Sequence, residues 1–390
     1  MRYKRAVVIV LDGVGCGALP DAADYGDQQS ATLQHVAAAV NGLCLPHLEK
    51  LGLGCITPIA GVAAVDQPQA CWGKMAEQSA GKDSVTGHWE LAGVVLKEPF
   101  ATYPDGFPPQ IISAFTAVAG VAPLGNVAAS GTDILRRLGE DHLRSGRPIV
   151  YTSTDSVFQI AVHEKIMPPA QLYDLCRETY QVLLSFNICR VIARPFLGDS
   201  AATFYRTSGR HDFSRTPPGD TLLDLLQQQG ITTCGIGKIG DLFAGTNLTY
   251  NIPTTDNRMG MDEILLALDT ISSGLIMANL VDFDMIYGHR LDAEGFAAAL
   301  ADFDRWLPRL LARLTPDDLL LITADHGCDP TTPGTDHTRE YVPLLAYSPA
   351  MTGTANIGTR HSFADLSATL AENFTLRSPS GESFLSFVEG

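Results

Sequence analysis

Positive charge is scarce in this chain of 390 residues. It has 27 Lys and Arg residues against 43 Asp and Glu residues, which gives a formal net charge of −16 at pH 7. Nucleic acids and anionic membranes attract proteins mainly through Lys and Arg, so we expect neither to be the main partner. A small anionic substrate would require a local basic pocket. Nothing in the composition indicates an oligomeric state.

The sequence also lacks CxxC pairs and long apolar runs. Its eight cysteines are scattered, unlike those of structural zinc sites or disulfide-rich domains, so we expect free thiols in a reducing compartment. The first apolar run, Ala6 to Leu11, is too short for the core of a signal peptide, and no run approaches the length that spans a bilayer. We therefore expect a soluble, cytoplasmic protein.

The chain is long and apolar enough for a large core. With 45% hydrophobic and 18% charged residues, it predicts a globular protein of two domains. Short apolar runs alternate with helical patterns outside a Pro- and Gly-rich middle segment, which indicates an α/β core interrupted by an insertion. We expect residues 1–97 and 220–390 to form the core and residues 98–219 an inserted domain.

Acidic residues follow three of the apolar runs. Asp12 comes after Arg5–Leu11, Asp284 soon after Leu275–Val281, and Asp325 soon after Leu319–Ile322. Short apolar runs of this kind are typical of strands buried in a parallel sheet, and ligands collect at the carboxyl ends of such strands. We expect the three carboxylates to meet at one edge of the sheet.

Histidines accompany two of these carboxylates. His289 follows Asp284, and His326 and His337 lie in the Gly- and Pro-rich loop after Asp325. Three carboxylates and three imidazoles are more ligands than one catalytic ion needs, and this donor set suits two divalent cations, with manganese or magnesium at least as suitable as zinc. Read alone, the loop at Asp325 could also be a solvated polar loop.

A hydroxyl-bearing segment, Gly81 to Leu91, leads into a short predicted helix. Ser84 or Thr86 could hold a phosphoryl group there, because free backbone N–H groups and the helix dipole face that end. The alternative is that one of the two hydroxyls only caps the helix.

Arginines concentrate within the predicted insertion. Between Ser185 and Pro217 lie five arginines and two aspartates. Because the guanidinium group matches phosphate bidentately, this segment is a candidate anion pocket, with a solvated charged face as the alternative.

Five stretches of the sequence form recognisable motifs: residues 11–15 (LDGVG), 81–90 (GKDSVTGHWE), 149–156 (IVYTSTDS), 279–284 (NLVDFD) and 323–340 (TADHGCDPTTPGTDHTRE). Together they resemble the prokaryotic phosphopentomutase family, within the alkaline phosphatase superfamily. The resemblance extends over nearly the whole chain.

The resemblance implies an alkaline-phosphatase-like α/β core, with a central, mostly parallel sheet flanked by helices, and an inserted α/β cap domain. It implies that Asp284, His289 and His337 hold one cation, usually manganese, and that Asp12, Asp325 and His326 hold the other.

It also implies a phosphorylated hydroxyl at Ser84, where the family pattern has Thr, while Thr86 remains the alternative. The implied substrate contacts are Asp155, Arg190, Arg194, Arg206, Arg210, His211 and Lys238.

The implied activity is the interconversion of ribose 1-phosphate and ribose 5-phosphate, and of the 2-deoxy forms, with a sugar bisphosphate as activator and intermediate. Two other classes of function use similar residues. One is a cofactor-independent phosphoglycerate mutase or a phosphatase on the same metal core, and the other is a metal-stabilised binding protein. An arginine-rich insertion is unnecessary for an open phosphatase site, and a binding protein has no use for a hydroxyl beside two cations. The core motifs alone do not exclude the phosphoglycerate mutase, so that choice depends on the inserted domain and on the family resemblance.

Overall fold

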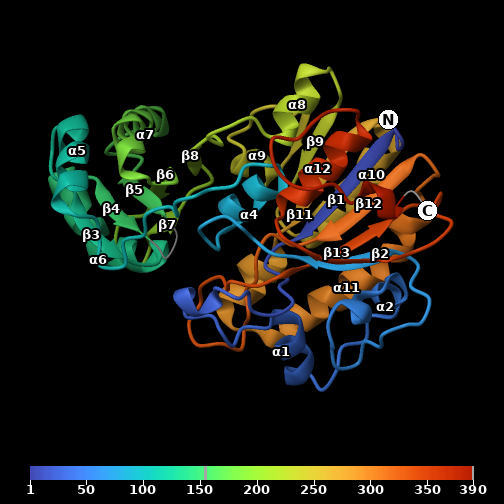
Figure 1. Cartoon of the computed structure of the whole chain (residues 1–390). Helices are drawn as coiled ribbons and strands as arrows, with labels where there is room; N and C mark the ends of the chain where they lie inside the picture. Colours follow the sequence, from blue (N-terminus) through green and yellow to red (C-terminus); the bar gives the residue numbers. More distant parts are fainter. Residues whose placement is uncertain (153–155, 389–390) are drawn as a thin grey trace. The chain divides into compact units, whose positions relative to one another are not determined.

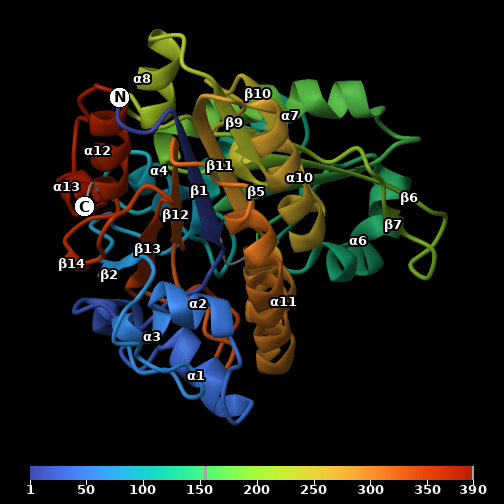
Figure 2. The same cartoon turned by 90° about the vertical axis from the view of Figure 1, so that its right-hand side faces the viewer.

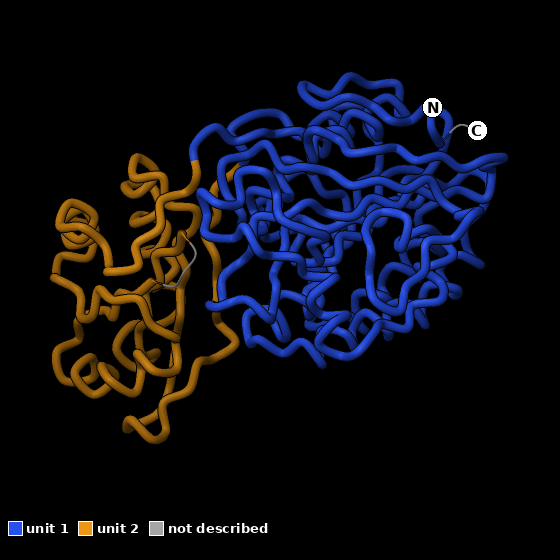
Figure 3. The backbone as a smooth tube through the Cα atoms, turned by 60° about the horizontal axis from the view of Figure 1, so that its bottom comes forward, with its two compact units in different colours: residues 1–98, 217–390 blue, residues 99–216 orange. Residues whose placement is uncertain are grey.

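The computed structural model describes residues 1–152 and 156–388. The chain forms two compact units, Met1–Glu98 with Pro217–Gly390 and Pro99–Thr216 (Figure 3). The division expected from the sequence falls after residues 97 and 219. Within the described residues, no helix combines the length and the apolar character that crossing a membrane requires.

An eight-stranded sheet forms the centre of the larger unit (Figure 1). In spatial order its strands are β10 (Tyr250–Ile252), β9 (Thr233–Ile236), β11 (Gly274–Leu280), β1 (Arg5–Leu11), β12 (Asp318–Thr323), β13 (Val342–Tyr347), β2 (Cys71–Met75) and β14 (Asn356–Arg360). The strands from β10 to β12 are parallel, and β1, β11 and β12 are buried along their whole length.

Strand β13 reverses the direction of the sheet. It runs antiparallel to both β12 and β2, while β14 is parallel to β2. A parallel neighbour requires a crossover connection, whereas the segment from Ala324 to Tyr341 contains no helix and returns the chain directly. The expected α/β fold with a mostly parallel sheet is confirmed.

Helices pack on both sides of this sheet. On one side α11 (Ala293–Leu311) contacts α1 (Thr32–Ala39) and α2 (Pro46–Leu51), and on the other α12 (Ala364–Asn373) contacts α4 (Ser84–Leu91) and α8 (Leu222–Gln228) (Figures 1 and 2). The remaining helices of this unit are η1 (Ala22–Tyr25), α3 (Leu53–Ile56), α9 (Ile239–Leu242), α10 (Asn257–Thr270), the π-helix η3 (Phe283–Tyr287), η4 (Gly288–Arg290) and α13 (Leu385–Val388).

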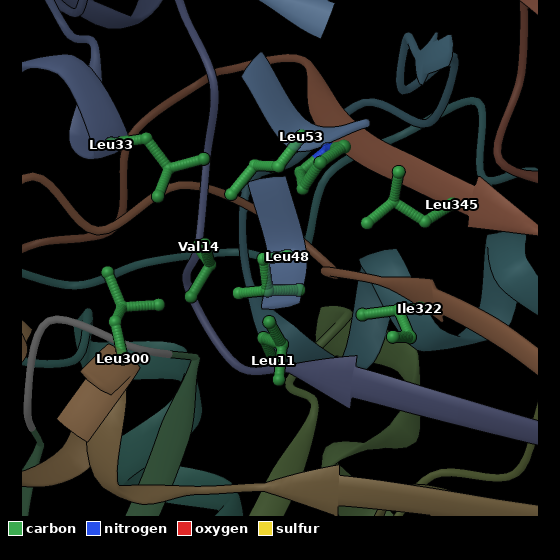
Figure 4. Close-up of a pocket in the computed structure, with 9 residues that line it drawn as sticks. Leu11, Val14, Leu33, Leu48, Leu53, Leu300, Ile322 and Leu345 are labelled. Carbon is green, nitrogen blue, oxygen red and sulfur yellow. The ribbon is translucent and has the colours of Figure 1, made fainter. Parts of the chain in front are cut away.

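A small apolar cavity lies between β1, β12, β13 and the helices beside them (Figure 4). Its volume is about 10 Å³, close to the least that holds one water molecule. It is lined by Leu11, Val14, Leu33, Leu48, Leu53, Leu300, Ile322, Pro343 and Leu345. The lining is apolar throughout, so we treat the cavity as a packing defect of the core.

The smaller unit has a sheet and a core of its own. Its strands are β3 (Leu124–Ala128), β4 (Ile149–Thr152), β5 (Val157–His163), β6 (Arg190–Leu197) and β7 (Tyr205–Arg206), in that spatial order, with β8 (His211–Ser214) also paired to β6. Its helices are α5 (Pro109–Ala119), α6 (Gly131–Ser145), α7 (Pro169–Leu183) and η2 (Leu184–Phe186). Phe107, Phe115 and Phe158 pack together at its centre.

Candidate active site

Three neighbouring parallel strands end at the same edge of the large sheet. Leu11, the last residue of β1, pairs with Leu280 of β11, and Val10 pairs with Thr323 of β12. The chain that leaves these strands carries Asp12, Asp284 and Asp325, so the shared register brings the three carboxylates to one place. Asp284 lies in η3, and π-helical turns occur frequently at functional sites.

Asp12, Asp325 and His326 form the first group of potential metal ligands. Their ligand atoms lie within 4.8 Å of one another. Nε2 of His326 is 3.4 Å from both Asp12 Oδ1 and Asp325 Oδ2. All three residues are buried, and the backbone N–H of Gly13 donates to Asp325 Oδ1 at 3.1 Å.

Asp284, His289 and His337 meet immediately beside the first group. Oδ1 of Asp284 is 3.3 Å from Nε2 of His289 and 3.3 Å from Nε2 of His337. The rings of His337 and His326 have centroids 4.1 Å apart, and Asp284, His326 and His337 also satisfy the spacing of a ligand group. The six residues predicted as ligands therefore lie in one continuous cluster.

Cations fit the polar atoms of this cluster. Asp12 Oδ1, Asp284 Oδ1, Asp325 Oδ2 and His337 Nε2 are buried and make no hydrogen bond to any described residue. Orphaned buried polar atoms are costly, and oxygen and imidazole nitrogen are donors that divalent cations accept. The residues present thus suit bound divalent cations.

Electrostatics also favour positive charge here. Burial opposes protonation of His326, yet the carboxylates of Asp325 and Asp12 raise the pKa of His326 well above its ordinary value. The Lys238 ammonium lies 2.8 Å from Asp12 Oδ2 and 3.7 Å from Asp284 Oδ2. Burial opposes its charge as well, but Asp12 and Asp284 raise the pKa of Lys238 above its ordinary value. One ammonium balances only part of the three carboxylate charges.

Cys328 is a further neighbour of the cluster. With Asp284 and His289 it satisfies the same ligand spacing. Burial, together with the negative charge of Asp284, raises the pKa of the Cys328 thiol well above its ordinary value. The carboxylates and imidazoles already supply six oxygen and nitrogen ligands, so two cations do not require the Cys328 sulfur.

Ser84 is the first residue of α4, and its hydroxyl faces the cluster. Ser84 Oγ lies 3.1 Å from His326 Nε2. The alternative that Ser84 or Thr86 caps this helix does not hold, because Asp83 is the cap and its carboxylate accepts from the backbone N–H groups of Val85 and Thr86. The buried hydroxyl of Thr86 donates to Asp83 Oδ2 at 2.6 Å. Thr86 therefore supports the cap, whereas Ser84 remains available for chemistry.

Two buried charged residues that the sequence interpretation did not single out hold this arrangement. Arg339 donates to Glu77 Oε2 and to the carbonyl oxygens of Ser79 and Gly81, just ahead of Ser84. Glu340 accepts from the hydroxyl and backbone N–H of Thr32. Both residues follow His337 in the stretch 323–340, which carries the family resemblance. Two adjacent charged residues between the loop with the ligands and an apolar strand were the sequence feature that could have indicated them.

The loop that carries His337 folds back on itself. Gly327 and Thr338 exchange backbone hydrogen bonds of 3.1 and 2.7 Å, which bring His337 next to His326. A polar pocket of about 410 Å³ reaches His337 and is also lined by Tyr25, Asp27, Lys82 and Asp336. The ligand cluster is thus buried, but at His337 it borders a pocket that is large enough for a small molecule.

The predicted anion-binding arginines lie on β6 and β7 or directly before β8 of the smaller unit. Arg210 donates to both carboxylate oxygens of Asp212 at 2.7 Å, and Arg190 lies 3.7 Å from the same carboxylate. Arg194 Nε donates to Gln159 at 3.0 Å. Burial and the nearby Arg210 lower the pKa of Arg194 to about 10. This concentration of like charge is a favourable environment for an anion.

The other predicted substrate contacts differ in their surroundings. Arg194 and Arg206 lie near the hydroxyl of Tyr151, which was not among the predicted site residues. Burial raises the pKa of Tyr151, and the positive charges of the two arginines oppose that rise. His211 is exposed and packs against Tyr173 and Phe213. Lys238 belongs to the larger unit and pairs with the acidic cluster. Asp155 lies outside the described residues.

Comparison with known proteins identifies the family. A family model described as Metalloenzyme superfamily matches residues 4–378. The phosphopentomutase of Syntrophotalea carbinolica is 59% identical over 384 residues, covering 98% of each chain. That of Desulfitobacterium hafniense is 52% identical over 384 residues, covering 98% of this chain and 99% of the relative.

A solved structure of the PH0037 protein from Pyrococcus horikoshii covers 98% of this chain and 100% of its own, with 15% identity and a TM-score of 0.49, a similarity too low to indicate a function. The curated relatives and the family model decide the assignment: the chain belongs to the phosphopentomutase family of the Metalloenzyme superfamily, and it is an isomerase that transfers phosphoryl groups.

Proposed function

We propose that this enzyme interconverts ribose 1-phosphate and ribose 5-phosphate, together with the 2-deoxyribose equivalents. Its relatives of 59% and 52% identity are named phosphopentomutases and match it over nearly their whole length. The observation that carries the chemistry is the Ser84 hydroxyl, 3.1 Å from His326 within the cluster of the six predicted ligands. The free thiols of all eight cysteines support the cytoplasm as its location.

In this proposal Ser84 carries a phosphoryl group between turnovers. The phosphoryl group moves from Ser84 Oγ to the free sugar hydroxyl at C1 or C5. The Oγ–P bond breaks as the new P–O bond forms, and the proton of the sugar hydroxyl passes to Ser84 Oγ. The resulting sugar bisphosphate then gives its other phosphoryl group to Ser84 Oγ and recovers a hydroxyl at that carbon. Each cycle therefore conserves the number of phosphoryl groups, and a trace of sugar bisphosphate serves as activator by phosphorylating Ser84.

Two divalent cations, proposed to be manganese, complete the site. Asp12, Asp325 and His326 would hold one cation, and Asp284, His289 and His337 the other. Bound there, the cations would neutralise phosphoryl oxygens and lower the pKa of the Ser84 hydroxyl. The protein contributes the orientation of Ser84, through the Asp83 cap and the first turn of α4.

Recognition of the sugar phosphate is assigned to basic groups. We propose that Arg190, Arg194, Arg206 and Arg210 bind the phosphate that is not being transferred, with Asp155, His211 and Lys238 as further contacts. The support is the concentration of positive charge, since burial and the nearby Arg210 together lower the pKa of Arg194. The domain of residues 98–219 would also exclude water, because water would hydrolyse the phosphoserine.

Phosphorus NMR of the purified protein tests the reaction. With manganese, ribose 5-phosphate and a trace of ribose 1,5-bisphosphate, we expect a signal from ribose 1-phosphate and little inorganic phosphate. Free phosphate without ribose 1-phosphate would show a phosphatase and refute the proposal. Turnover of 3-phosphoglycerate in place of the pentose would instead favour the related phosphoglycerate mutase.

Intact mass spectrometry identifies the nucleophile. After incubation with ribose 1,5-bisphosphate, the wild type and Thr86→Ala should each gain one phosphoryl group, whereas Ser84→Ala should gain none. Ser84→Thr keeps a hydroxyl at the first helical position and serves as the matched control that should still be phosphorylated. A phosphorylated Ser84→Ala variant would exclude Ser84.

A further inference from the structure

The helix that begins at Ser84 contains a fully buried histidine, His88, to which the proposed reaction assigns no part. Its two neighbours have structural roles. Trp89 Nε1 donates to the carbonyl oxygen of Leu242, and Glu90 accepts from the backbone N–H groups of Gln78 and Ser79. His88 contacts the candidate site itself through one edge of its ring and strand β11 through the other.

The Nδ1 edge of His88 faces two oxygen atoms that cannot donate a hydrogen bond. It lies 2.9 Å from the carbonyl oxygen of Ser84 and 3.0 Å from Asp325 Oδ2. An unprotonated nitrogen would repel both acceptors, so Nδ1 carries the proton. The N–H donates to Ser84, while Asp325 Oδ2 is attracted by the same N–H and keeps its lone pairs for a cation.

The Nε2 edge is held by β11. The side-chain nitrogen of Asn279, which is buried, lies 3.2 Å from His88 Nε2. An amide nitrogen only donates, so Nε2 accepts and the neutral ring has a single tautomer. His88 thereby links β11, the first turn of α4 and the segment that follows β12.

Close packing brings α4 against this segment. A Cβ atom at Gly87 would lie 2.1 Å from the carbonyl oxygen of Asp325, so only glycine permits this approach. The two carboxylate oxygens of Asp325 then lie against different groups: Oδ1 accepts from the N–H of Gly13, and Oδ2 lies 3.0 Å from His88 Nδ1 without a hydrogen bond. The orientation of this carboxylate is therefore defined from both sides.

We propose that His88 is a positioning residue that couples the first turn of α4, at Ser84, to Asp325. It would orient the Ser84 hydroxyl and the Asp325 carboxylate toward the same cation. The inference rests on the proposed function, in which Ser84 is the nucleophile and Asp325 a ligand. Because His88 acts through these groups, its Nδ1–H should affect cation affinity and kcat rather than the KM for the sugar phosphate.

Two amide substitutions separate positioning from packing. In His88→Asn the amide can place an N–H near the position of Nδ1, and in His88→Gln it reaches toward Nε2 and Asn279 instead. Both remove the ring, so their packing losses are similar. Only His88→Asn preserves the donor that faces Ser84 and Asp325.

The experiment measures Mn²⁺ binding to the metal-depleted full chain by calorimetry, together with kcat and KM. We expect His88→Gln to bind Mn²⁺ about 10–100-fold more weakly and to lose kcat, as is typical when a group that orients a metal ligand is removed. His88→Asn should retain most of both, and KM should change little in either variant. Equal losses in the two variants, or wild-type Mn²⁺ affinity in His88→Gln, would overturn the proposal.

Two further variants keep the test decisive. If neither His88 variant folds, Asn279→Ala should still weaken Mn²⁺ binding, because the ring loses the donor that fixes its tautomer, and unchanged affinity would overturn the proposal. Phosphorylation of Ser84→Ala would refute the proposed nucleophile, whereas the Mn²⁺ affinities of the His88 variants would still report on the positioning of Asp325. The two failures are thus distinguishable.

Discussion

Replacing Lys238 by Met should destabilise the metal-free enzyme far more than the manganese-loaded enzyme. Lys238 is a positive group beside the buried carboxylates of Asp12 and Asp284, at 2.8 and 3.7 Å. Methionine has a similar length and preserves the packing of the lysine stem. The substitution therefore removes a charge and leaves two buried carboxylates with less compensation.

The expected magnitude follows from the burial of the pair. Removing one partner of a buried ion pair costs about 3–5 kcal/mol. The Lys238 side chain is 28% exposed, so we expect about 3 kcal/mol without metal, at the lower end of that range. Bound cations would compensate the same carboxylates, and the loss should then fall to about 1 kcal/mol.

The two losses also define a change in metal affinity. A thermodynamic cycle requires the difference, about 2 kcal/mol, to appear as tighter Mn²⁺ binding by the variant. Since 1.4 kcal/mol corresponds to a factor of ten, binding should strengthen about 30-fold. The sign is unusual for a substitution in an active site, which makes the prediction easy to refute.

Urea unfolding with EDTA and with Mn²⁺, combined with calorimetry of Mn²⁺ binding, measures all three quantities. Lys82→Met is a matched control, because Lys82 lies 3.0 Å from Asp27 and 3.3 Å from Asp336, neither of which is a predicted ligand. Its loss of stability should be the same in both conditions. Equal losses for Lys238→Met in EDTA and in Mn²⁺, or weaker Mn²⁺ binding, would refute the reasoning.

Two other predictions concern the support of the site and the core. Arg339→Lys should lower the free energy of unfolding by about 3 kcal/mol and should also lower kcat. Lysine cannot replace the buried guanidinium group, which binds Asp21, Glu77 and the chain before Ser84. An unchanged urea unfolding curve would contradict this prediction. Leu300→Ala should cost about 3 kcal/mol, because it enlarges a cavity that already exists (Figure 4). The control Leu300→Met should cost less than about 1.5 kcal/mol, and similar losses for both would contradict the packing account.

Local patterns were sufficient to predict the elements that lead into the site. The apolar runs before Asp12, Asp284 and Asp325 form β1, β11 and β12, because strands buried on both faces require nearly continuous apolar residues. The α/β class follows from the same alternation of short apolar runs and amphipathic helices. The antiparallel direction of β13 could not be predicted from these patterns, because it depends on the path that the loop after β12 takes back to the sheet.

The cap of α4 shows the limit of such patterns. Asp83, Ser84 and Thr86 are all residues that favour a helix start, and the sequence does not distinguish the cap from the group that faces the site. The tertiary structure does so, because Asp83 accepts the free N–H groups and the hydroxyl of Thr86, while Ser84 Oγ lies beside His326.

The sequence by itself determined the chemical groups and the strand ends at which they stand, because residue type and hydrophobic periodicity are local properties. Only the tertiary structure decided which groups meet: that Lys238 lies among the carboxylates, that Arg339 holds the chain before Ser84, and that His88 joins Ser84 to Asp325. These contacts join residues far apart in the chain, and their distances follow from sheet register and close packing, which a single sequence does not specify.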